Sequence, residues 1–315
     1  MLPSIVTIPP NKRREWQALL QRTFSTRWGR DYLRRDFFLD YVTHDPHHRM
    51  GHLVGLTVGN QLVSTYQVFR RRMVIGTRSY QVEGIGNVGT DVRFQGQGYG
   101  TSLLRSYLRT RVQGDVALVY AREGKLYRGL GWRRLRRHMI IVQRGAIAGL
   151  APLRPLRSRR VTPGDLPALA RIYSRFNRTE MLPHVVRSAS YWARWVSWKV
   201  KAYHLTADLF LEGTRTVGYM FSRRLGRTMV IEEYGALPSV RGRVYHAMLA
   251  HLSGARRATA LHVMRPAGSL EQFLDAVAAK YETRRGFHET GHVVICNPSL
   301  RSWSQRLALW HVDHF

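Results

Sequence analysis

Three glycines alternate with other residues where the sequence reads QGQGYG, at residues 95–100. They follow a β-branched run that ends at Val92 and precede Thr101 and two leucines. Glycine permits backbone conformations that turn successive N–H groups into one concave nest, and the first turn of a helix leaves further N–H groups without an acceptor. Such a nest binds a diphosphate without a metal ion, and the Thr101 hydroxyl adds a donor. We therefore predict a diphosphate-binding loop at this strand-to-helix turn.

Two common phosphate loops do not fit this context. A Rossmann loop follows the first strand of a parallel sheet and expects an acidic residue at the end of the next strand. Here the loop follows antiparallel strands, and Asp115 comes before the next strand. A Walker loop needs Gly-Lys-Ser/Thr, which this segment lacks.

The elements around the loop follow from apolar spacing. Helical periodicity predicts two opening helices, over 11–24 and 31–42. Residues 52–92 change to β-branched and aromatic runs broken by tight turns, which predicts three antiparallel strands. A helix over 101–112 and a buried strand over 116–121 come next.

A stretch rich in glycine and proline interrupts these patterns near residue 150. After it, the order of helices, hairpin strands, helix, strand, helix and strand repeats, up to a last strand over 292–298. We infer a tandem duplication of the fold. The second copy has one glycine, Gly242, where the loop has three, so we expect no cofactor there. The expected division is a catalytic domain over 1–145, a linker over 146–160, a second domain over 161–300 and a tail over 301–315.

The loop, its preceding strand and the following Leu103-Leu104 resemble the pyrophosphate loop of the GNAT acyltransferase superfamily. A second match, EGKLYRGLGWRRL at 123–135, resembles the Glu-Gly-x-x-Tyr pattern of Eis-like tandem-GNAT acetyltransferases. Motifs cover residues 1–145, and only the order of elements covers 160–298. The resemblance implies an α/β (α+β) fold of two tandem GNAT-like domains, each a mixed, mostly antiparallel sheet flanked by helices. In that group a sterol-carrier-like third domain follows, but here only 17 residues follow the last predicted strand, so we expect that domain to be missing.

The resemblance further implies that acetyl-coenzyme A is the co-substrate and lies in a splay between the fourth and fifth strands. Its pantetheine would pair with the backbone of the fourth strand, and its diphosphate would lie on the loop. The expected contacts are Val88, Thr90, Val92, Gln95, Gln97, Gly98, Tyr99, Gly100 and Thr101.

Tyr127 matches the general acid of the family, and a phenol remains protonated at pH 7. The alternative is that Tyr127 is a packing aromatic. In Eis-like enzymes the terminal carboxylate is the general base, and here Phe315 ends the sequence. Glu83 and Asp91 are alternative bases, and each is also a candidate ion-pair partner for arginine.

The formal net charge of +30 attracts polyanions and repels polycations. It reflects either a functional surface or an arginine-favouring composition. The acceptor is expected to be an amine on a small molecule or peptide. Asp31, Asp36, Asp40 and Asp45 would have to line the cleft for a polycationic amine to bind. Otherwise an amine on an anionic scaffold, such as aminoacyl-tRNA, fits better. A different hypothesis is a nucleic-acid-binding protein without catalysis. Self-association stays open.

The remaining residues give weaker indications. No apolar run is long enough to span a membrane and no signal peptide is recognisable, so we expect a cytoplasmic protein. Cys296 is expected to be buried in the last strand. Trp192, Trp195 and Trp198, at helical spacing, are expected in the core or between domains. His44, His47 and His48 lie close together in the sequence, but neighbouring histidines rarely face the same ion. No further ligand is identifiable at suitable spacing, so we expect no metal site.

Overall fold

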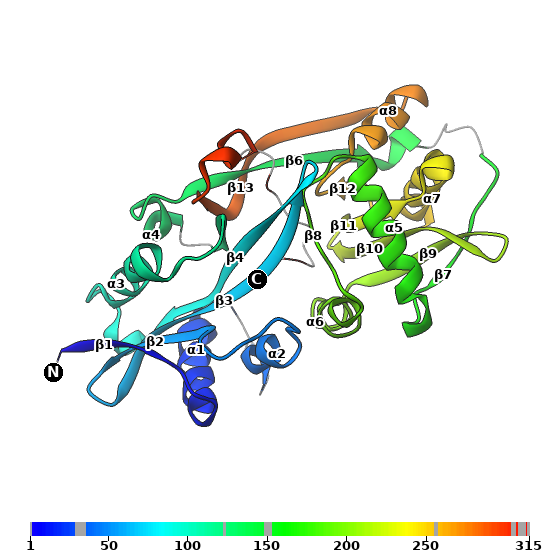
Figure 1. The fold of residues 1–315 in the computed structure, drawn as a ribbon. Helices are drawn as coiled ribbons and strands as arrows, with labels where there is room; N and C mark the ends of the chain where they lie inside the picture. The colour runs from blue at the N-terminus through cyan, green and yellow to red at the C-terminus, as the bar shows by residue number, and fades with distance from the viewer. Residues whose placement is uncertain are drawn as a thin grey trace.

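A computed structural model describes residues 2–28, 36–121, 124–147, 153–254, 258–303, 307 and 313 of the chain. Two α/β halves lie side by side, and long strands run between them (Figure 1). The first half consists of β1 (Pro3–Thr7), α1 (Arg13–Trp28), α2 (Phe37–Thr43), β2 (Leu53–Val58), β3 (Gln61–Ile75), β4 (Arg78–Thr90), α3 (Tyr99–Ser106), β5 (Val116–Tyr120), α4 (Gly124–Arg128) and β6 (Arg133–Gln143). The second half consists of β7 (Arg157–Arg160), α5 (Leu166–Thr179), β8 (His184–Val185), α6 (Ser197–Ala202), β9 (Thr206–Glu212), β10 (Arg215–Leu225), β11 (Thr228–Ala236), α7 (Arg241–Gly254), β12 (Ala260–Val263), α8 (Gly268–Ala276) and β13 (Tyr281–Ile295).

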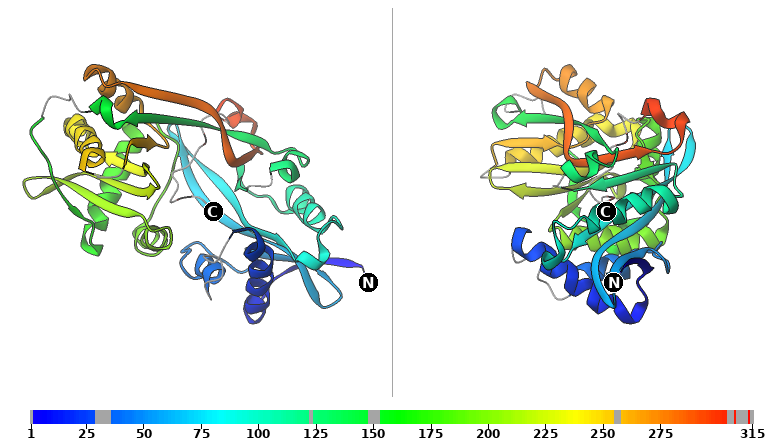
Figure 2. Two further views of the ribbon diagram at one scale, coloured as in Figure 1. Left: turned by 180° about the vertical axis from the view of Figure 1, so that it is seen from behind. Right: turned by 90° about the vertical axis from the view of Figure 1, so that its left-hand side faces the viewer.

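The strands of both halves form one sheet in the order β1-β2-β3-β4-β5-β13-β6-β12-β11-β10-β9-β7. In this order only the β4–β5 and β11–β12 pairs are parallel. In each pair the first strand is the last strand of a hairpin, and the second strand follows a helix. The last strand, β13, lies between β5 and β6, while β6 pairs with β12 of the second half. Figure 2 shows these two long strands crossing from one half to the other. The hydrogen-bonded pairing therefore crosses the predicted linker, and the division into domains stays a prediction.

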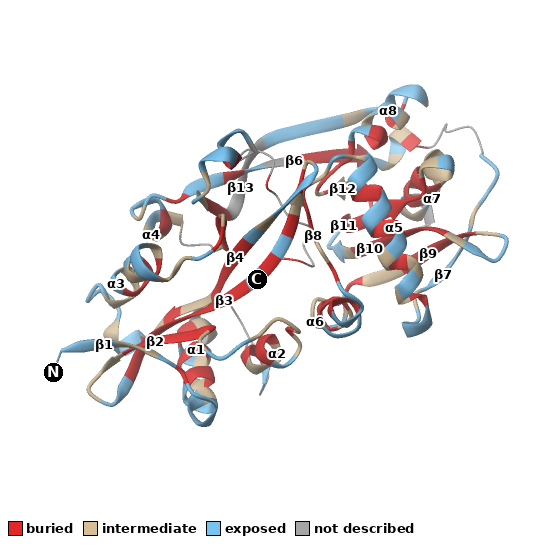
Figure 3. Ribbon diagram, in the orientation of Figure 1, coloured by how far each residue is buried: buried red, intermediate tan, exposed pale blue. Residues whose placement is uncertain are grey.

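β13 is longer than the predicted last strand, because its first part extends along β6. Its first part pairs only with β6, and Glu282–Arg285 are exposed (Figure 3). Two short edge strands were not predicted: β1, and β7, which lies within the predicted linker. Cys296 was predicted to be buried, but it is exposed because β13 ends one residue earlier, at Ile295.

Aromatic side chains fill the junction of the two halves. Trp192, Trp195 and Trp198 are all buried, as predicted, on a π-helical turn and α6. Trp195 contacts Tyr41 of α2 and Phe69 of β3, with ring centroids 5.9 and 5.7 Å apart respectively. These contacts pack the second half directly on the first.

A buried amine lies among these rings. The Nζ of Lys199 is 4.6–5.4 Å from the centroids of Tyr41, Trp195, Trp198 and Tyr203. Burial, and then the charge of Arg71, lower the pKa of Lys199 to about 7. The interface therefore holds a lysine that loses its proton near neutral pH.

We expect the halves to unfold together, because β13 of the second half is hydrogen-bonded within the first. Leu209→Ala on β9 removes a fully buried side chain and should cost about 2–5 kcal/mol of unfolding free energy. Urea unfolding followed by circular dichroism should show one transition, and hydrogen exchange at β5 should also accelerate. The control is Leu225→Ala on β10, where the side chain is 52% exposed. Two separate transitions would contradict the expectation.

Lys199 should make stability rise with pH above neutrality. Its pKa is about 7 in the folded protein, against an ordinary value of 10.5, so the unfolded chain binds more protons between these values. Between pH 7 and pH 9 this group should add ~2 kcal/mol to the unfolding free energy. Lys199→Met should remove that increment in urea titrations at the two pH values. Lys201→Met, at an exposed neighbouring lysine, should retain it, and equal slopes in all three proteins would disprove the effect.

Candidate active site

The glycine loop joins the end of β4 to the start of α3. Gly96 and Gly98 have φ of 79° and 80°, the left-handed region that glycine adopts without strain. Gly98 caps α3, and its carbonyl accepts the first helical hydrogen bond, from Ser102 at 2.9 Å. The N–H groups of the first helical turn, from Tyr99 onward, have no acceptor within the helix. Residues 95–98 are exposed, and Tyr99 and Gly100 are half-buried, so these donors form an accessible site for an anion.

Buried contacts hold the loop in place. Asp91 is fully buried and accepts hydrogen bonds from the guanidinium groups of Arg22 and Arg93. The hydrogen bonds from Arg93 are the main cause that lowers the pKa of Asp91, which burial opposes. The carboxylate is therefore firmly ionised, and this environment opposes the alternative role of Asp91 as a proton acceptor.

The start of α3 packs closely on the end of β4. A Cβ at Gly100 would lie 3.0 Å from the Thr90 Oγ1. The Thr90 hydroxyl is 2.9 Å from the Ser64 Oγ, and the Thr90 carbonyl accepts from the Gln95 side chain at 3.0 Å. The third glycine of the motif thus allows the helix to approach the strand, while the other two shape the turn.

β4 separates from β5 before it reaches the loop. Their ladder ends at Ile85–Val119, whereas β4 continues to Thr90. On its other edge β4 has a bulge opposite β3, where the register shifts between Thr65 and Gln67, and Asn87 adopts a φ of 50°. The last residues of β4, including Val88 and Thr90, are thereby released from β5. This opening corresponds to the splay that the resemblance implied.

Tyr127 lies on α4, next to β13, which is the other neighbour of β5 in the sheet. It is buried, and its ring stacks on His292 of β13 at 5.6 Å and meets Trp132 edge-on at 5.7 Å. Burial raises the pKa of Tyr127, so the phenol keeps its proton at neutral pH. No residue in the described part of the chain forms a hydrogen bond with its hydroxyl. The environment is compatible with a proton donor and also with a packing role, so the assignment stays a prediction.

His292 is a neighbour that sequence reasoning missed, because it comes from the last strand of the second half. The only local signal is Gly124, where a Cβ would lie 2.9 Å from the His292 Nε2 and 2.8 Å from an Arg128 nitrogen. The glycine of the second motif therefore makes room for a side chain from the other half.

Of the candidate bases Glu83 and Phe315, the structure describes only Glu83. Glu83 is buried on the part of β4 that is still paired with β5. Its oxygens accept from Arg70 at 3.1 Å and from the Tyr107 hydroxyl at 2.7 Å. An acceptor or a water molecule would have to replace one of these partners, and the role of Glu83 stays a prediction. Phe315 lies outside the described residues.

The corresponding place in the second half is closed. β11 also continues beyond the end of its pairing with its parallel partner β12, but it is followed by Leu237 and Pro238 instead of glycines. The Tyr234 hydroxyl accepts from the Ala267 backbone N–H at 2.7 Å and so ties the strand to the segment before α8. A second cofactor is therefore not expected there.

The described residues contain no group of three metal-ligating side chains. They also contain no helix that is long and apolar enough to cross a membrane.

Gly98→Ala tests the loop. Alanine at a φ of 80° costs about 1–2 kcal/mol, and relief of this strain would turn the N–H groups away from the ligand. Calorimetric titration with coenzyme A should therefore show at least about tenfold weaker binding. The matched control is Gly213→Ala, in the β9–β10 turn, where φ is 59° and a Cβ also meets nothing within 4 Å. Unchanged affinity in Gly98→Ala would refute the assignment of the loop.

Comparisons with known proteins identify a matching domain family and similar folds. Residues 7–135 match the family model described as an acetyltransferase (GNAT) domain. A GCN5-related N-acetyltransferase from Kribbella flavida superposes with a TM-score of 0.67 at 18% identity, covering 94% of this chain and 71% of that chain. Eis1 from Mycobacterium abscessus gives a TM-score of 0.65 at 17% identity, covering 96% of this chain and 76% of that chain.

A more distant likeness is to Saccharomyces cerevisiae N-myristoyltransferase with bound myristoyl-CoA, with a TM-score of 0.56 at 11% identity over 94% of this chain and 80% of that chain. No curated protein matches the sequence. Residues 7–135 therefore form a GNAT acetyltransferase domain, a type of domain that uses acetyl-coenzyme A as its co-substrate, within a chain that has the tandem GNAT fold.

Proposed function

We propose that this chain transfers an acetyl group from acetyl-coenzyme A to an amine, by direct attack in a ternary complex. The observation that carries the proposal is the opening after Ile85 and Val119, with the left-handed glycine Gly98 at its end. The loop N–H groups would hold the diphosphate, and the free edge of β4 would pair with the pantetheine amides. The thioester would then lie deeper in the opening, toward α4.

In this mechanism the neutral amine attacks the thioester carbonyl carbon, and the C–S bond breaks as the new C–N bond forms. The departing thiolate needs a proton, and the attacking nitrogen must lose one. We assign the first transfer to the Tyr127 hydroxyl, which burial keeps protonated. The second needs a base, for which Glu83 and Phe315 stay the candidates.

The charges of the protein bear on which class of acceptor amine it binds. Two of the four aspartates that would attract a polycation already have arginine partners: Asp36 pairs with Arg14 at 2.8 Å and Asp45 with Arg71 at 3.0 Å. Asp31 lies outside the described residues. Asp40 has no ion-pair partner among the described residues. Because two of these carboxylates are neutralised in a chain of net charge +30, we favour an amine carried on an anionic scaffold, such as aminoacyl-tRNA. A small free amine is the alternative.

The deciding experiment measures release of free thiol from acetyl-coenzyme A with a panel of acceptors, including aminoglycosides, peptides and charged tRNA. The proposal expects turnover with at least one amine, and the preferred scaffold expects a rate with charged tRNA that falls steeply with added salt. Salt-dependent RNA binding without thiol release and without affinity for coenzyme A would instead indicate a non-catalytic nucleic-acid-binding protein.

Tyr127→Phe should lower kcat by about 10²-fold or more, because the leaving thiolate loses its proton donor. The KM for acetyl-coenzyme A should change little, since the ring and its packing on His292 are retained. The control is Tyr80→Phe, which removes a hydroxyl from the far end of β4. Full activity in Tyr127→Phe would exclude the acid role, while the cofactor site would stand.

A further inference from the structure

The second half contains a cavity of about 610 Å³ between α7 and the edge of the sheet that β9 and β7 form. α7 lines it with Ala247 and Ala250, whose short side chains leave the space open. The cavity is separate from the glycine loop, and none of its lining residues belongs to the candidate active site. It is therefore a candidate for a separate binding site.

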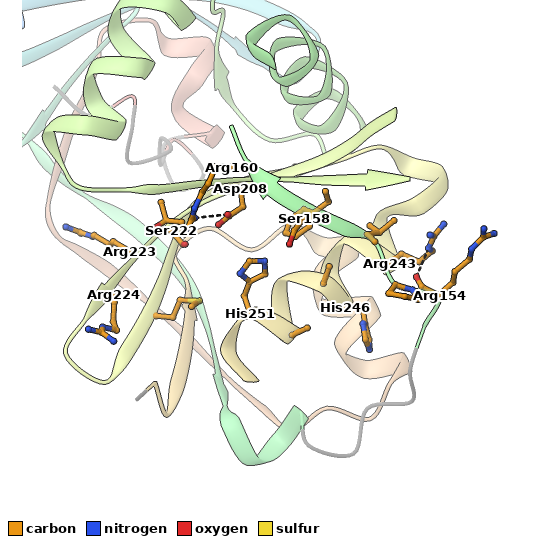
Figure 4. A pocket seen from close by; sticks show the side chains of 17 residues that line it. Arg154, Ser158, Arg160, Asp208, Ser222, Arg223, Arg224, Arg243, His246 and His251 are labelled. Atoms are coloured by element: carbon orange, nitrogen blue, oxygen red, sulfur yellow. Dashed lines mark hydrogen bonds and ion pairs between the residues drawn. The ribbon is translucent and has the colours of Figure 1, made fainter. Parts of the chain in front are cut away.

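The cavity is elongated along the strands. Its wall follows β9 from Thr206 to Phe210, a length of about 13 Å. β10 and β7 both run antiparallel to β9. Arg224 of β10 therefore lies beyond the Thr206 end, and Arg154, which precedes β7, lies beyond the other end. Figure 4 shows these two arginines at opposite ends of the cavity, with Arg160 between them, so a ligand that meets both ends must itself be long.

Positive charge is available at both ends of the cavity and between them. Arg154 and Arg224 are exposed, and neither has a carboxylate partner within the described residues. Arg160 donates to the buried Asp208 at 2.7 Å, yet its side chain is still 69% exposed. Among the described residues that line the cavity, Asp208 is the only acidic one. The cavity thus offers a row of three cationic groups, and its two ends are too far apart for one small anion.

We propose that this cavity is a groove that binds the phosphate backbone of a single nucleic-acid strand. A strand has one phosphate on every nucleotide, so separate phosphates meet Arg154, Arg160 and Arg224. The space between α7 and the sheet admits one strand, whereas a duplex meets only the rim of the groove.

As a docking surface the groove rests on the proposed function, in which the favoured acceptor has an anionic scaffold. β10 is six strands away from β4 in the sheet order, about 29 Å at ~4.8 Å per strand. The groove therefore holds a part of the scaffold that is distant from the reacting amine. Binding at the groove needs no acetyl transfer, so the two claims can fail separately.

Fluorescence anisotropy tests the groove with a labelled single-stranded RNA of about 12 nucleotides, in the absence of acetyl-coenzyme A. Arg154→Gln with Arg224→Gln should weaken binding at least about fivefold, because two phosphate contacts are lost. The slope of log K against log salt concentration should become shallower by about 1.4, since each single-strand contact contributes ~0.7. Ala250→Met fills the groove without a change of charge and should also weaken RNA binding, at least about threefold.

The matched control is Arg157→Gln with Arg215→Gln, which removes two exposed arginines from β7 and β10 that do not line the cavity. It should leave the affinity within about twofold and the salt slope unchanged, since only the general attraction of the surface falls. An RNA duplex of the same length is the second control, and the groove variant and the matched control should weaken its binding equally.

Three results would overturn the proposal: equal losses of single-stranded RNA binding in the groove variant and the matched control, an unchanged salt slope in the groove variant, or full affinity in Ala250→Met. All of these substitutions are at exposed residues, and equal thermal midpoints would verify that each variant is folded. Thiol release with the acceptor panel is scored separately. Its absence rejects acetyl transfer while the groove stands, and its presence with a failed groove leaves acetyl transfer standing.

Discussion

One interruption of hydrogen bonding shapes the first half of this protein. β4 and β5 are parallel neighbours up to Ile85 and Val119, and beyond that point β4 continues alone. A parallel pair that ends early exposes backbone N–H and C=O groups in the interior of a sheet, where they need partners. The bulge at Asn87, the glycine loop and the start of α3 are all located where a long ligand with amides and phosphates would supply those partners.

The exchange of strands explains why the second half is needed for this opening. β13 lies on the far edge of β5 and brings His292 against Tyr127. The first half therefore cannot complete its own sheet. The second half retains the same order of elements, but a tyrosine–backbone hydrogen bond closes the place where the first half opens. The first half thus has a free strand edge, and the second half has a cavity beside α7.

Charge is distributed unequally in this molecule. Most arginines lie on the surface, yet Arg71 and Arg187 are buried with Asp45 and with Glu233 and Asp313 respectively. These pairs lie beside the aromatic junction, where Arg71 and Lys199 contact the same Trp195 ring. The pairs Arg71–Asp45 and Arg187–Glu233 each lie within one half, but the Arg71 guanidinium also lies 5.2 and 4.9 Å from the ring centroids of Tyr191 and Trp195 of the second half, so this buried charge adds contacts across the junction. The surface arginines, in contrast, are available to attract anionic partners.

Several strands, one helix and the glycine turn could be predicted from the sequence. Alternating apolar residues indicated β2 to β4, helical spacing indicated the buried face of α3, and the three glycines indicated the turn between them, because each of these features depends on residues close in the chain.

Tertiary structure alone decided what depends on distant residues. The sequence pattern did not reveal that β13 would pair with β5, that Cys296 would lie beyond the strand and be exposed, or that both oxygens of Glu83 would have partners. Nor did it indicate the cavity around Asp208, since an absence of packing is a property of facing elements and not of any one segment. The sequence by itself thus predicted the glycine turn, which the structure has, and the diphosphate that we propose as its ligand. The partners of the catalytic candidates were decided only when both halves folded into one sheet, because hydrogen bonds between distant strands leave no local pattern.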